Sequence, residues 1–301
     1  MIEPLNSLLS QWNLDVVHFK KETISPNIYR ISTDKAVYFL KNRIETSLLE
    51  RYEEYSLTQY LQHKGLNVET PVLTKGNDPF VEKESGFYSL YGALEGETKE
   101  EFPISMSLVF SIGEYLGLLH KLMSTYKSRE EPIEWNVFFY LESWRKERHH
   151  TQVGAWAKKN FFQYDEVLSN YKEMPLQFIH SDFHLKNLLI VDNKMKGLID
   201  FERIRKAPRV VDVAYFITGI LRKQAGEGKL LFIEEFLKGY ENKNGLTPHE
   251  KDCLPYLILI LLLQYSFFYE QRGFTNVVSK LLTCIDTLQK RRDYVETFKT
   301  F

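Results

Sequence analysis

The stretch Phe178-Ile-His-Ser-Asp-Phe-His-Leu-Lys-Asn-Leu-Leu-Ile190 is soon followed by Gly197-Leu-Ile-Asp-Phe-Glu202. Within these segments Asp182, Asn187 and Asp200 stand at successive spacings of five and thirteen residues. The apolar runs around them are typical of short strands. The pattern predicts a strand, a tight polar loop, a second strand, a turn and a third strand. We therefore expect the three oxygen-bearing side chains to converge at the mouth of the loop.

This set of side chains suits phosphoryl transfer from a nucleotide. One carboxylate must orient and deprotonate the attacking hydroxyl, and we expect Asp182 to do so. A side-chain amide and a second carboxylate must hold Mg²⁺ against the phosphates, because hard cations prefer oxygen ligands. Asn187 and Asp200 are the candidates for these metal ligands. A lone His-x-Asp is more often a capped turn, but the joint pattern in this order favours a catalytic site.

The motifs His180-x-Asp182-x4-Asn187 and Ile199-Asp200-Phe201-Glu202 resemble the catalytic and metal loops of the aminoglycoside phosphotransferase, choline kinase and homoserine kinase superfamily. The resemblance implies an α+β, protein-kinase-like fold of two lobes. The N-lobe would be a small antiparallel sheet with one helix, and the larger C-lobe would be mainly helical. The resemblance also implies ATP and Mg²⁺ as cofactors and a hydroxyl of a small molecule as phosphate acceptor.

Two further features favour the small-molecule branch over protein kinases. Ser181 follows the motif histidine, where protein kinases usually have Arg, and Phe201-Glu202 replaces their Phe-Gly. No Ala-Pro-Glu motif closes a long activation loop, and the next predicted helix begins near Val211. In the branch that this chain resembles, an Asp in the place of Asp212 supports the catalytic loop.

The first part of the chain is predicted to contain strands and one helix, and the second part is predicted to be mainly helical. Strands are predicted at 16–19, 28–31, 37–41, 72–73, 80–81 and 87–91, and a helix over 45–64 that Gly65 can end. The segment 92–97, bracketed by two glycines, is the best linker and resembles the family's hinge. We thus expect an N-lobe over 1–91, a hinge over 92–97 and a C-lobe over 98–301. Helices of the C-lobe are predicted at 105–123, 135–149, 161–171, 211–225, 230–240 and 249–300, with a break near Gly273.

On the nucleotide side, Lys41 closes an apolar strand shortly before the predicted helix. The resemblance implies that this Lys bonds the α and β phosphates and that a helix carboxylate holds it. Glu54 fits the family pattern better than Glu50 or Glu53. The segment 20–27, expected as the loop between the first two strands, contains no glycine, which weakens the case for close phosphate contact.

The acceptor is expected between the catalytic loop and the later helices, where Tyr215, Tyr265, Tyr269 and Glu270 are candidates. Aromatic residues at helical spacing are more often core than pocket. An aminoglycoside would need an acidic pocket, and choline an aromatic cage with a carboxylate. Homoserine-like and thiosugar-like acceptors stay open as well.

Composition narrows the function classes. The 301 residues carry a net charge of −1, which gives no global electrostatic case for nucleic acid or a membrane surface as a partner. The apolar run 256–263 is too short for a span and is interpreted as a core helix. The N-terminus lacks signal-peptide features, and Cys253 and Cys284 show no metal or redox spacing, so we expect buried thiols in the cytoplasm. The sequence does not indicate the oligomeric state.

A second function from another class stays open. It is that of a catalytically silent protein with the kinase fold and a binding or structural role. Some bacterial spore-coat relatives resemble such a protein. The intact motifs favour activity, whereas the missing glycine loop favours silence.

Overall fold

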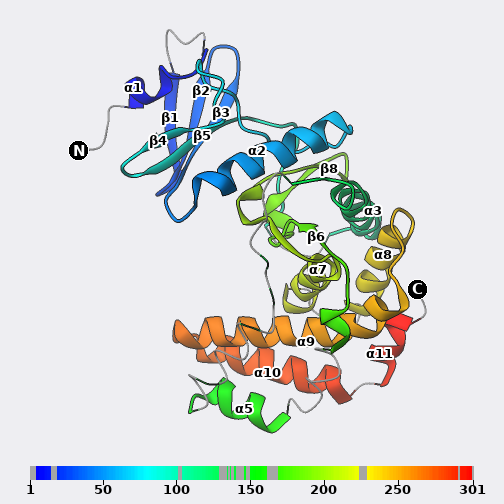
Figure 1. The fold of residues 1–301 in the computed structure, drawn as a ribbon. Helices are drawn as coiled ribbons and strands as arrows, with labels where there is room; N and C mark the ends of the chain where they lie inside the picture. Colours follow the sequence, from blue (N-terminus) through cyan, green and yellow to red (C-terminus); the bar gives the residue numbers. More distant parts are fainter. Residues whose placement is uncertain are drawn as a thin grey trace.

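A computed structural model describes residues 5–14, 19–100, 104–128, 150–160, 169–223, 229–290 and 292–299, with Glu134, Asn136, Phe139 and Lys146 between them. The chain folds into a strand-rich N-lobe and a larger helical C-lobe (Figure 1). The described residues therefore have the predicted division of secondary structure.

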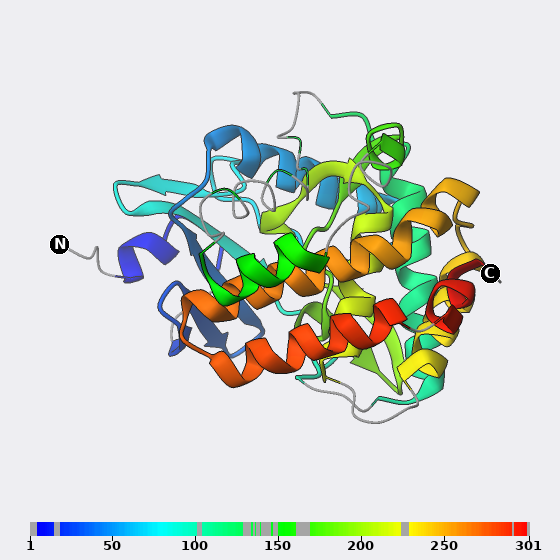
Figure 2. The ribbon, with the colours of Figure 1, turned by 90° about the horizontal axis from the view of Figure 1, so that it is seen from below.

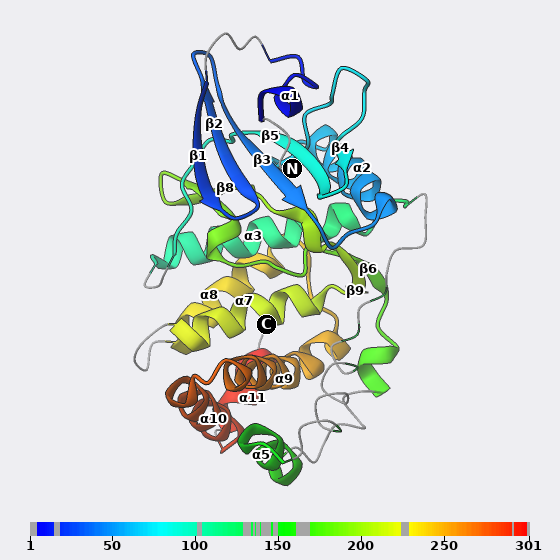
Figure 3. The ribbon, with the colours of Figure 1, turned by 90° about the vertical axis from the view of Figure 1, so that its left-hand side faces the viewer.

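The N-lobe is built on a five-stranded antiparallel sheet. Its order is β1-β2-β3-β5-β4 (Figure 3), and the short helix α1 (Leu5–Leu9) packs beside it. The strands are β1 (Phe19–Ser25), β2 (Ile28–Thr33), β3 (Val37–Arg43), β4 (Val81–Lys83) and β5 (Gly86–Gly92). Alternate residues of a strand face the same side, which places Ile31, Leu40 and Leu90 in the small core of this lobe.

The predictions for strands 28–31, 37–41 and 87–91 are confirmed, and two other predictions are wrong. The segment 20–27 is not a loop: β1 runs to Ser25, pairs with β2, and leaves only Pro26 and Asn27 as the turn. Residues 72–73 form no strand, because the backbone pairing of this segment with the sheet is limited to an isolated bridge of Pro71 with Tyr91. Of the first predicted strand, residues 16–18 lie outside the described residues.

Helix α2 (Leu48–His63) confirms the predicted helix of the N-lobe. It begins with a capping box, in which Ser47 accepts from the amide of Glu50 and the Glu50 side chain accepts from the amide of Ser47. Its residues Leu57 and Leu61 belong to the large core shared with the C-lobe. The helix therefore anchors one lobe to the other.

The glycine-bracketed segment 92–97 leads from β5 into the C-lobe. Gly96 has a φ of +120°, and a Cβ there would lie 3.1 Å from the backbone nitrogen of Ile190, so only glycine fits without strain. Immediately afterwards, Glu97 exchanges two backbone hydrogen bonds with Ile190. The lobe boundaries at 91 and 97 stay a prediction.

The C-lobe combines two short β-ladders with a bundle of helices (Figures 1 and 2). The ladders pair β6 (Leu176–Ile179) with β9 (Arg205–Pro208) and β7 (Leu188–Val191) with β8 (Lys194–Leu198). The helices are α3 (Met106–Met123), α5 (Gln152–Asn160), α7 (Val210–Lys223), α8 (Lys229–Glu241), α9 (Pro248–Gln271), α10 (Thr275–Lys290) and α11 (Arg292–Lys299). The predicted break near Gly273 is confirmed. The predicted helix 135–149 and residues 161–168 lie outside the description, apart from Asn136, Phe139 and Lys146.

Helix α9 is long and apolar enough to cross a membrane, but 67% of its most apolar window is buried inside the protein. It packs against α7, α10 and α11 (Figure 2), as expected for a core helix. Its Cys253 is buried, as predicted, whereas Cys284 on α10 is only half-buried.

Helices α3 and α8 approach so closely that an added methyl group should separate them. A Cβ on Gly239 would lie 2.1 Å from the carbonyl oxygen of Phe110. We expect Gly239→Ala to lower the free energy of unfolding by roughly 1–3 kcal/mol, because backbone cannot yield as a side chain does. Gly219→Ala on α7 is the matched control: apart from its chain neighbours and the backbone of its own helix, no atom lies within 4 Å of its Cβ. Alanine should stabilise that helix by roughly 0.5–1 kcal/mol. Urea unfolding of both variants measures the difference, and equal stabilities would contradict it.

Candidate active site

The catalytic loop is fixed by a buried carboxylate on α7. Asp212 accepts hydrogen bonds from the backbone amides of His180 and Ser181, each at 2.8 Å, and from Nε2 of His120 at 3.2 Å. Its exposed fraction is 0%. Asp212 therefore takes the supporting position that the sequence predicted.

His180 is a structural residue of this loop. Its Nε2 lies 3.1 Å from the carbonyl oxygen of Ile199, and its Nδ1 accepts from the amide of Asp182 at 3.3 Å. Burial lowers the pKa of His180, although the charges of Asp212 and Asp182 oppose the shift. A neutral ring that donates from Nε2 and accepts at Nδ1 satisfies both contacts, and it links the catalytic loop to the strand before Asp200.

Asp182 is a partly exposed carboxylate that contacts His184 and Tyr215. Its Oδ1 accepts from the phenol of Tyr215 at 2.9 Å and lies 3.5 Å from Nε2 of His184. Burial alone would raise the pKa of Asp182, but His184 and then Tyr215 outweigh it and lower the pKa to about 2. Since 15% of the side chain is still exposed, a ligand can reach this carboxylate.

Asn187 contacts Asp182, and Asp200 lies close enough to Asp182 for their charges to interact, so each offers an oxygen ligand near this carboxylate. The side-chain nitrogen of Asn187 donates to the backbone carbonyl of Asp182 at 3.0 Å, which leaves its amide oxygen for another partner. Asp200 has a φ of +69°, a strained conformation that is common at functional sites. Within the described residues, no group of three His, Cys, Asp or Glu side chains could hold a metal alone. This donor set nevertheless fits Mg²⁺, which proteins bind by one or two side chains together with substrate phosphates.

The lysine of β3 has a different partner from the one predicted. Nζ of Lys41 lies 2.6 Å from Oε2 of Glu69 and 3.8 Å from Oδ1 of Asp200, and it is buried. The expected ion pair with Glu54 is therefore wrong. Glu54 instead binds Arg51 and accepts from the phenol of Tyr91 at 2.8 Å, because these donors stand closer on α2 and β5.

Glu69 joins the two lobes at this point. The same Oε2 atom that binds Lys41 accepts the backbone amide of Asp200 at 3.0 Å. Glu69 thus positions both the lysine and the start of the metal loop. Its position directly after Val68 in the turn that follows α2 gave little sign of this role, since a single acidic residue in a turn is usually solvated.

A second cation, Arg43, forms ion pairs with carboxylates of the metal loop, residues 199–202. Its guanidinium lies 2.7 Å from Oδ1 of Asp200 and forms an ion pair with Glu202. Burial would raise the pKa of Asp200, but the charges of Lys41 and Arg43 lower it below its usual value. Burial raises the pKa of Glu202, with Arg43 opposing. The sequence could have indicated this role of Arg43, because side chains two residues apart on a strand, such as Lys41 and Arg43, lie on the same face.

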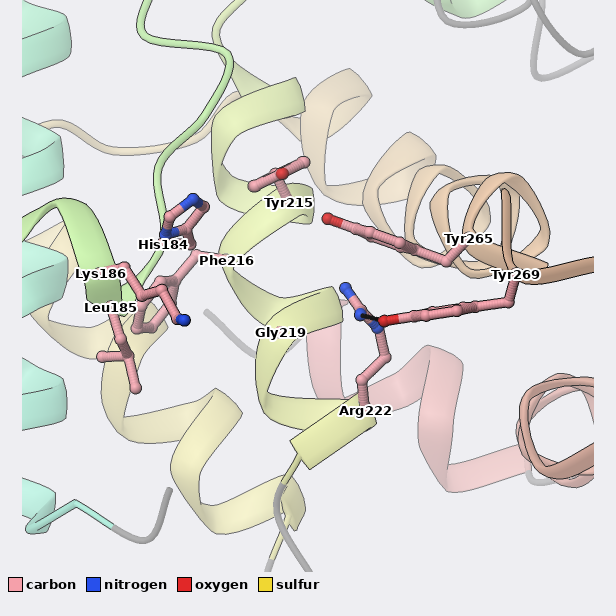
Figure 4. A pocket seen from close by; sticks show the side chains of 9 residues that line it. All are labelled: His184, Leu185, Lys186, Tyr215, Phe216, Gly219, Arg222, Tyr265 and Tyr269. Atoms are coloured by element: carbon pink, nitrogen blue, oxygen red, sulfur yellow. Dashed lines mark hydrogen bonds between the residues drawn. The ribbon is translucent and has the colours of Figure 1, made fainter. Parts of the chain in front are cut away.

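A cavity of about 290 Å³ opens beside the catalytic loop (Figure 4). Figure 4 shows His184 and Lys186 on one wall and the rings of Tyr265 and Tyr269 on the opposite wall. Its lining residues come from the loop, α7 and α9, and they are His184, Leu185, Lys186, Tyr215, Phe216, Gly219, Arg222, Tyr265 and Tyr269. Three of the four acceptor candidates therefore meet here. The fourth, Glu270, does not line the cavity and accepts from the amide of Val153 at 2.9 Å.

Arg222 is the lining residue that the sequence interpretation missed. Tyr215, Gly219 and Arg222 recur at i, i+4 and i+7 on α7, so one helix face carries all three into the cavity. The position of Tyr215 near the catalytic loop could have pointed to Arg222. Tyr265 and Tyr269 share a face of α9 in the same way.

The low pKa of Asp182 predicts where pH will act on this site. The pKa of this carboxyl is lower in the folded protein than its ordinary value of 3.8. Its contribution to stability is therefore present above pH 3.8 and is lost as the pH falls towards 2. We expect the stability difference between the wild type and Asp182→Asn to be constant from about pH 5 to 8 and to change below about pH 4. Urea unfolding across this range measures it. A change centred near pH 6 would contradict the assignment.

Known proteins resemble the chain over most of its length. Amicoumacin kinase of Bacillus subtilis (strain 168) is 24% identical over an alignment of 268 residues, which covers 81% of this chain and 77% of that protein. The structure of an amicoumacin kinase in complex with AMP-PNP, Ca²⁺ and Ami superposes with a TM-score of 0.76 at 17% identity, over 94% of this chain and 92% of the other. For the microcompartment-associated aminopropanol kinase the TM-score is 0.74 at 16% identity, over 98% and 97%.

These superpositions show the protein-kinase-like fold of small antiparallel-sheet lobe and helical lobe, which confirms the predicted fold class. The predicted superfamily is confirmed by a family model as well. The model described as the phosphotransferase enzyme family matches residues 16–250, well over half of the sequence. The chain therefore belongs to the phosphotransferase enzyme family.

Proposed function

We propose that this protein transfers the γ-phosphate of ATP to a hydroxyl group of a small molecule bound in the cavity beside Asp182. The observation that carries the proposal is the hydrogen bond from Tyr215, which lines the cavity, to the carboxylate of Asp182. A reacting hydroxyl in the cavity would reach an ionised carboxylate whose orientation is already fixed. The relatives named as amicoumacin kinase and aminopropanol kinase support a small-molecule acceptor.

In the proposed reaction Asp182 accepts a hydrogen bond from the acceptor hydroxyl and orients its oxygen towards the γ-phosphorus. A bond forms between that oxygen and phosphorus, the bond from phosphorus to the β–γ bridging oxygen breaks, and ADP leaves. The hydroxyl proton passes to Asp182. Because the pKa of Asp182 is about 2, the carboxylate is a weak base and takes the proton late in the transfer.

Asn187 and Asp200 would hold Mg²⁺ through their side-chain oxygens. The ion would neutralise charge that develops on the phosphates. Arg43 now neutralises Asp200, so we expect its guanidinium to turn towards the phosphates when nucleotide binds.

Lys41 would bind the α and β phosphates, with Glu69 rather than Glu54 as its carboxylate partner. Glu54 would support the nucleotide site indirectly, since it fixes the phenol of Tyr91, whose ring centroid lies 4.7 Å from Nζ of Lys41. In this proposal, residues 1–91 form the nucleotide-binding lobe, 92–97 the hinge and 98–301 the lobe for catalysis and acceptor binding.

A catalytically silent binding protein is the second candidate. The glycine-free turn at Pro26 and Asn27 favours it, because it limits the close approach of phosphates to backbone amides. The guanidinium of Arg43 also favours it, because it occupies the carboxylate of Asp200 that would hold Mg²⁺. The intact set of Asp182, Asn187 and Asp200 favours the kinase.

Thermal unfolding with ATP and Mg²⁺ distinguishes the two candidates. A nucleotide at about 100 times its dissociation constant should stabilise the protein by about 2.7 kcal/mol. We expect this stabilisation to require Mg²⁺ and to be largely lost in Asp200→Ala. Stabilisation that is absent, or equal in both proteins, would reject the metal-dependent kinase. A panel of small hydroxyl compounds, followed by ADP release, then tests turnover.

A further inference from the structure

Arg222 is held in place at the end of the cavity far from Asp182. Its guanidinium carbon lies 3.5 Å from the ring centroid of Tyr265, and its NH2 group donates to the phenol of Tyr269 at 2.8 Å. Figure 4 shows the side chain reaching from α7 towards Tyr269. An arginine that is stacked and hydrogen-bonded in this way is already oriented, so binding through its fork costs little conformational entropy.

The guanidinium has no carboxylate partner among the residues that the structure describes. Five N–H groups are available on an arginine, and the contact with Tyr269 uses one of them. The side chain is half-buried, which makes an uncompensated charge costly. Lys186 also lines the cavity, 3.8 Å from Glu100, and no Asp or Glu of the described chain is part of the lining. The nearby carboxylate of Asp182 lies at the other end, where it accepts from Tyr215.

This arrangement opposes a cationic acceptor. An ammonium group could bind the face of a tyrosine ring, but Arg222 already covers that of Tyr265. A polyamine-bearing sugar would need acidic residues, which the described lining lacks. The cavity volume of about 290 Å³ lies at the lower end of the usual range for ligand pockets, roughly 300–1,000 Å³, and suits a small acceptor.

Resting on the proposed function, we propose that the acceptor is an anionic hydroxyl compound, whose carboxylate or phosphate binds Arg222 while its hydroxyl lies at Asp182. Tyr215 and Arg222 are seven residues apart on α7, which is roughly 10 Å along a helix axis. The hydroxyl and the anionic group therefore belong at opposite ends of the acceptor. The aromatic rings of Tyr265 and Tyr269 form the wall between them.

Three matched probes test the charge preference: 4-(2-hydroxyethyl)benzoate, the corresponding amide and the corresponding benzylamine. They share a ring and a hydroxyl and differ in the group opposite the hydroxyethyl chain, which is anionic, neutral or cationic. Isothermal titration of the whole protein should show the benzoate binding about tenfold or more tightly than the amide, as expected for hydrogen bonds to a charged group. The benzylamine should bind more weakly than both. The same titration with phenyl phosphate and phenylacetate ranks phosphate against carboxylate.

Arg222→Gln should reduce the affinity for the benzoate to that for the amide. Arg272→Gln is the matched control, because its guanidinium also stacks at 3.5 Å, on Phe268, but outside the cavity. It should leave all affinities unchanged. Four results would each overturn the inference. In the wild type they are tighter binding of the benzylamine, no preference for the benzoate, or no measurable binding of any probe. In Arg222→Gln it is an unchanged benzoate affinity. Stabilisation by ATP and Mg²⁺ is measured separately, so a failure here leaves the kinase proposal standing.

Discussion

Asp182→Asn should lower the turnover number by roughly 10²–10⁴-fold, the usual contribution of a positioned acid or base. The amide keeps the size of the carboxylate but cannot accept the hydroxyl proton. Nucleotide binding should persist, because Lys41, Asn187 and Asp200 are unchanged. ADP release with an active hydroxyl compound measures turnover, and thermal unfolding with ATP and Mg²⁺ measures binding.

Tyr215→Phe is the matched control for this prediction. It removes the hydrogen bond to Asp182 but keeps the ring and the carboxylate, so turnover should fall much less than in Asp182→Asn. Losing that bond should also raise the pKa of Asp182 towards its usual range. Turnover in Asp182→Asn that matches the wild type would refute the role of this carboxylate.

The placement of the residues proposed for catalysis and metal binding was predictable because they are close in sequence. Asp182 follows β6, Asn187 precedes β7 and Asp200 follows β8, so local spacing determines the loops that carry them. The supporting position of Asp212 was implied by the family resemblance, and it stands in the first turn of the next helix.

The contacts that join distant segments were not predictable. Lys41 could pair with any acid near α2, and only the packing of the turn after that helix on β8 brings Glu69 to it. Arg43 meets Asp200 from 157 positions away. The segment 20–27 was misjudged because its exposed strand lacks the alternation that a buried face imposes. The spacing of residues within one segment does not show which distant residues they will contact.

Asp212→Ala should destabilise the fold and impair catalysis together. Removing a fully buried carboxylate leaves two backbone amides and the His120 ring without an acceptor, at an expected cost of roughly 3–5 kcal/mol in the free energy of unfolding. The amides belong to His180 and Ser181, directly before Asp182. A shift of about 1 Å in a catalytic group can cost 100-fold in rate, so the folded fraction should also turn over far more slowly.

Glu250→Ala separates these two effects. Glu250 is equally buried and binds Arg209 through both carboxylate oxygens, at 2.8 Å each, but it caps α9 and does not contact the catalytic loop. Its loss should lower stability while the folded fraction keeps its turnover number. If urea unfolding and turnover at a temperature where both variants are folded show the same loss in each, Asp212 acts only through stability. A rate loss confined to Asp212→Ala shows instead that the buried carboxylate on α7 positions the catalytic loop, because both variants lose a buried charge and only one loses the acceptor of the loop amides.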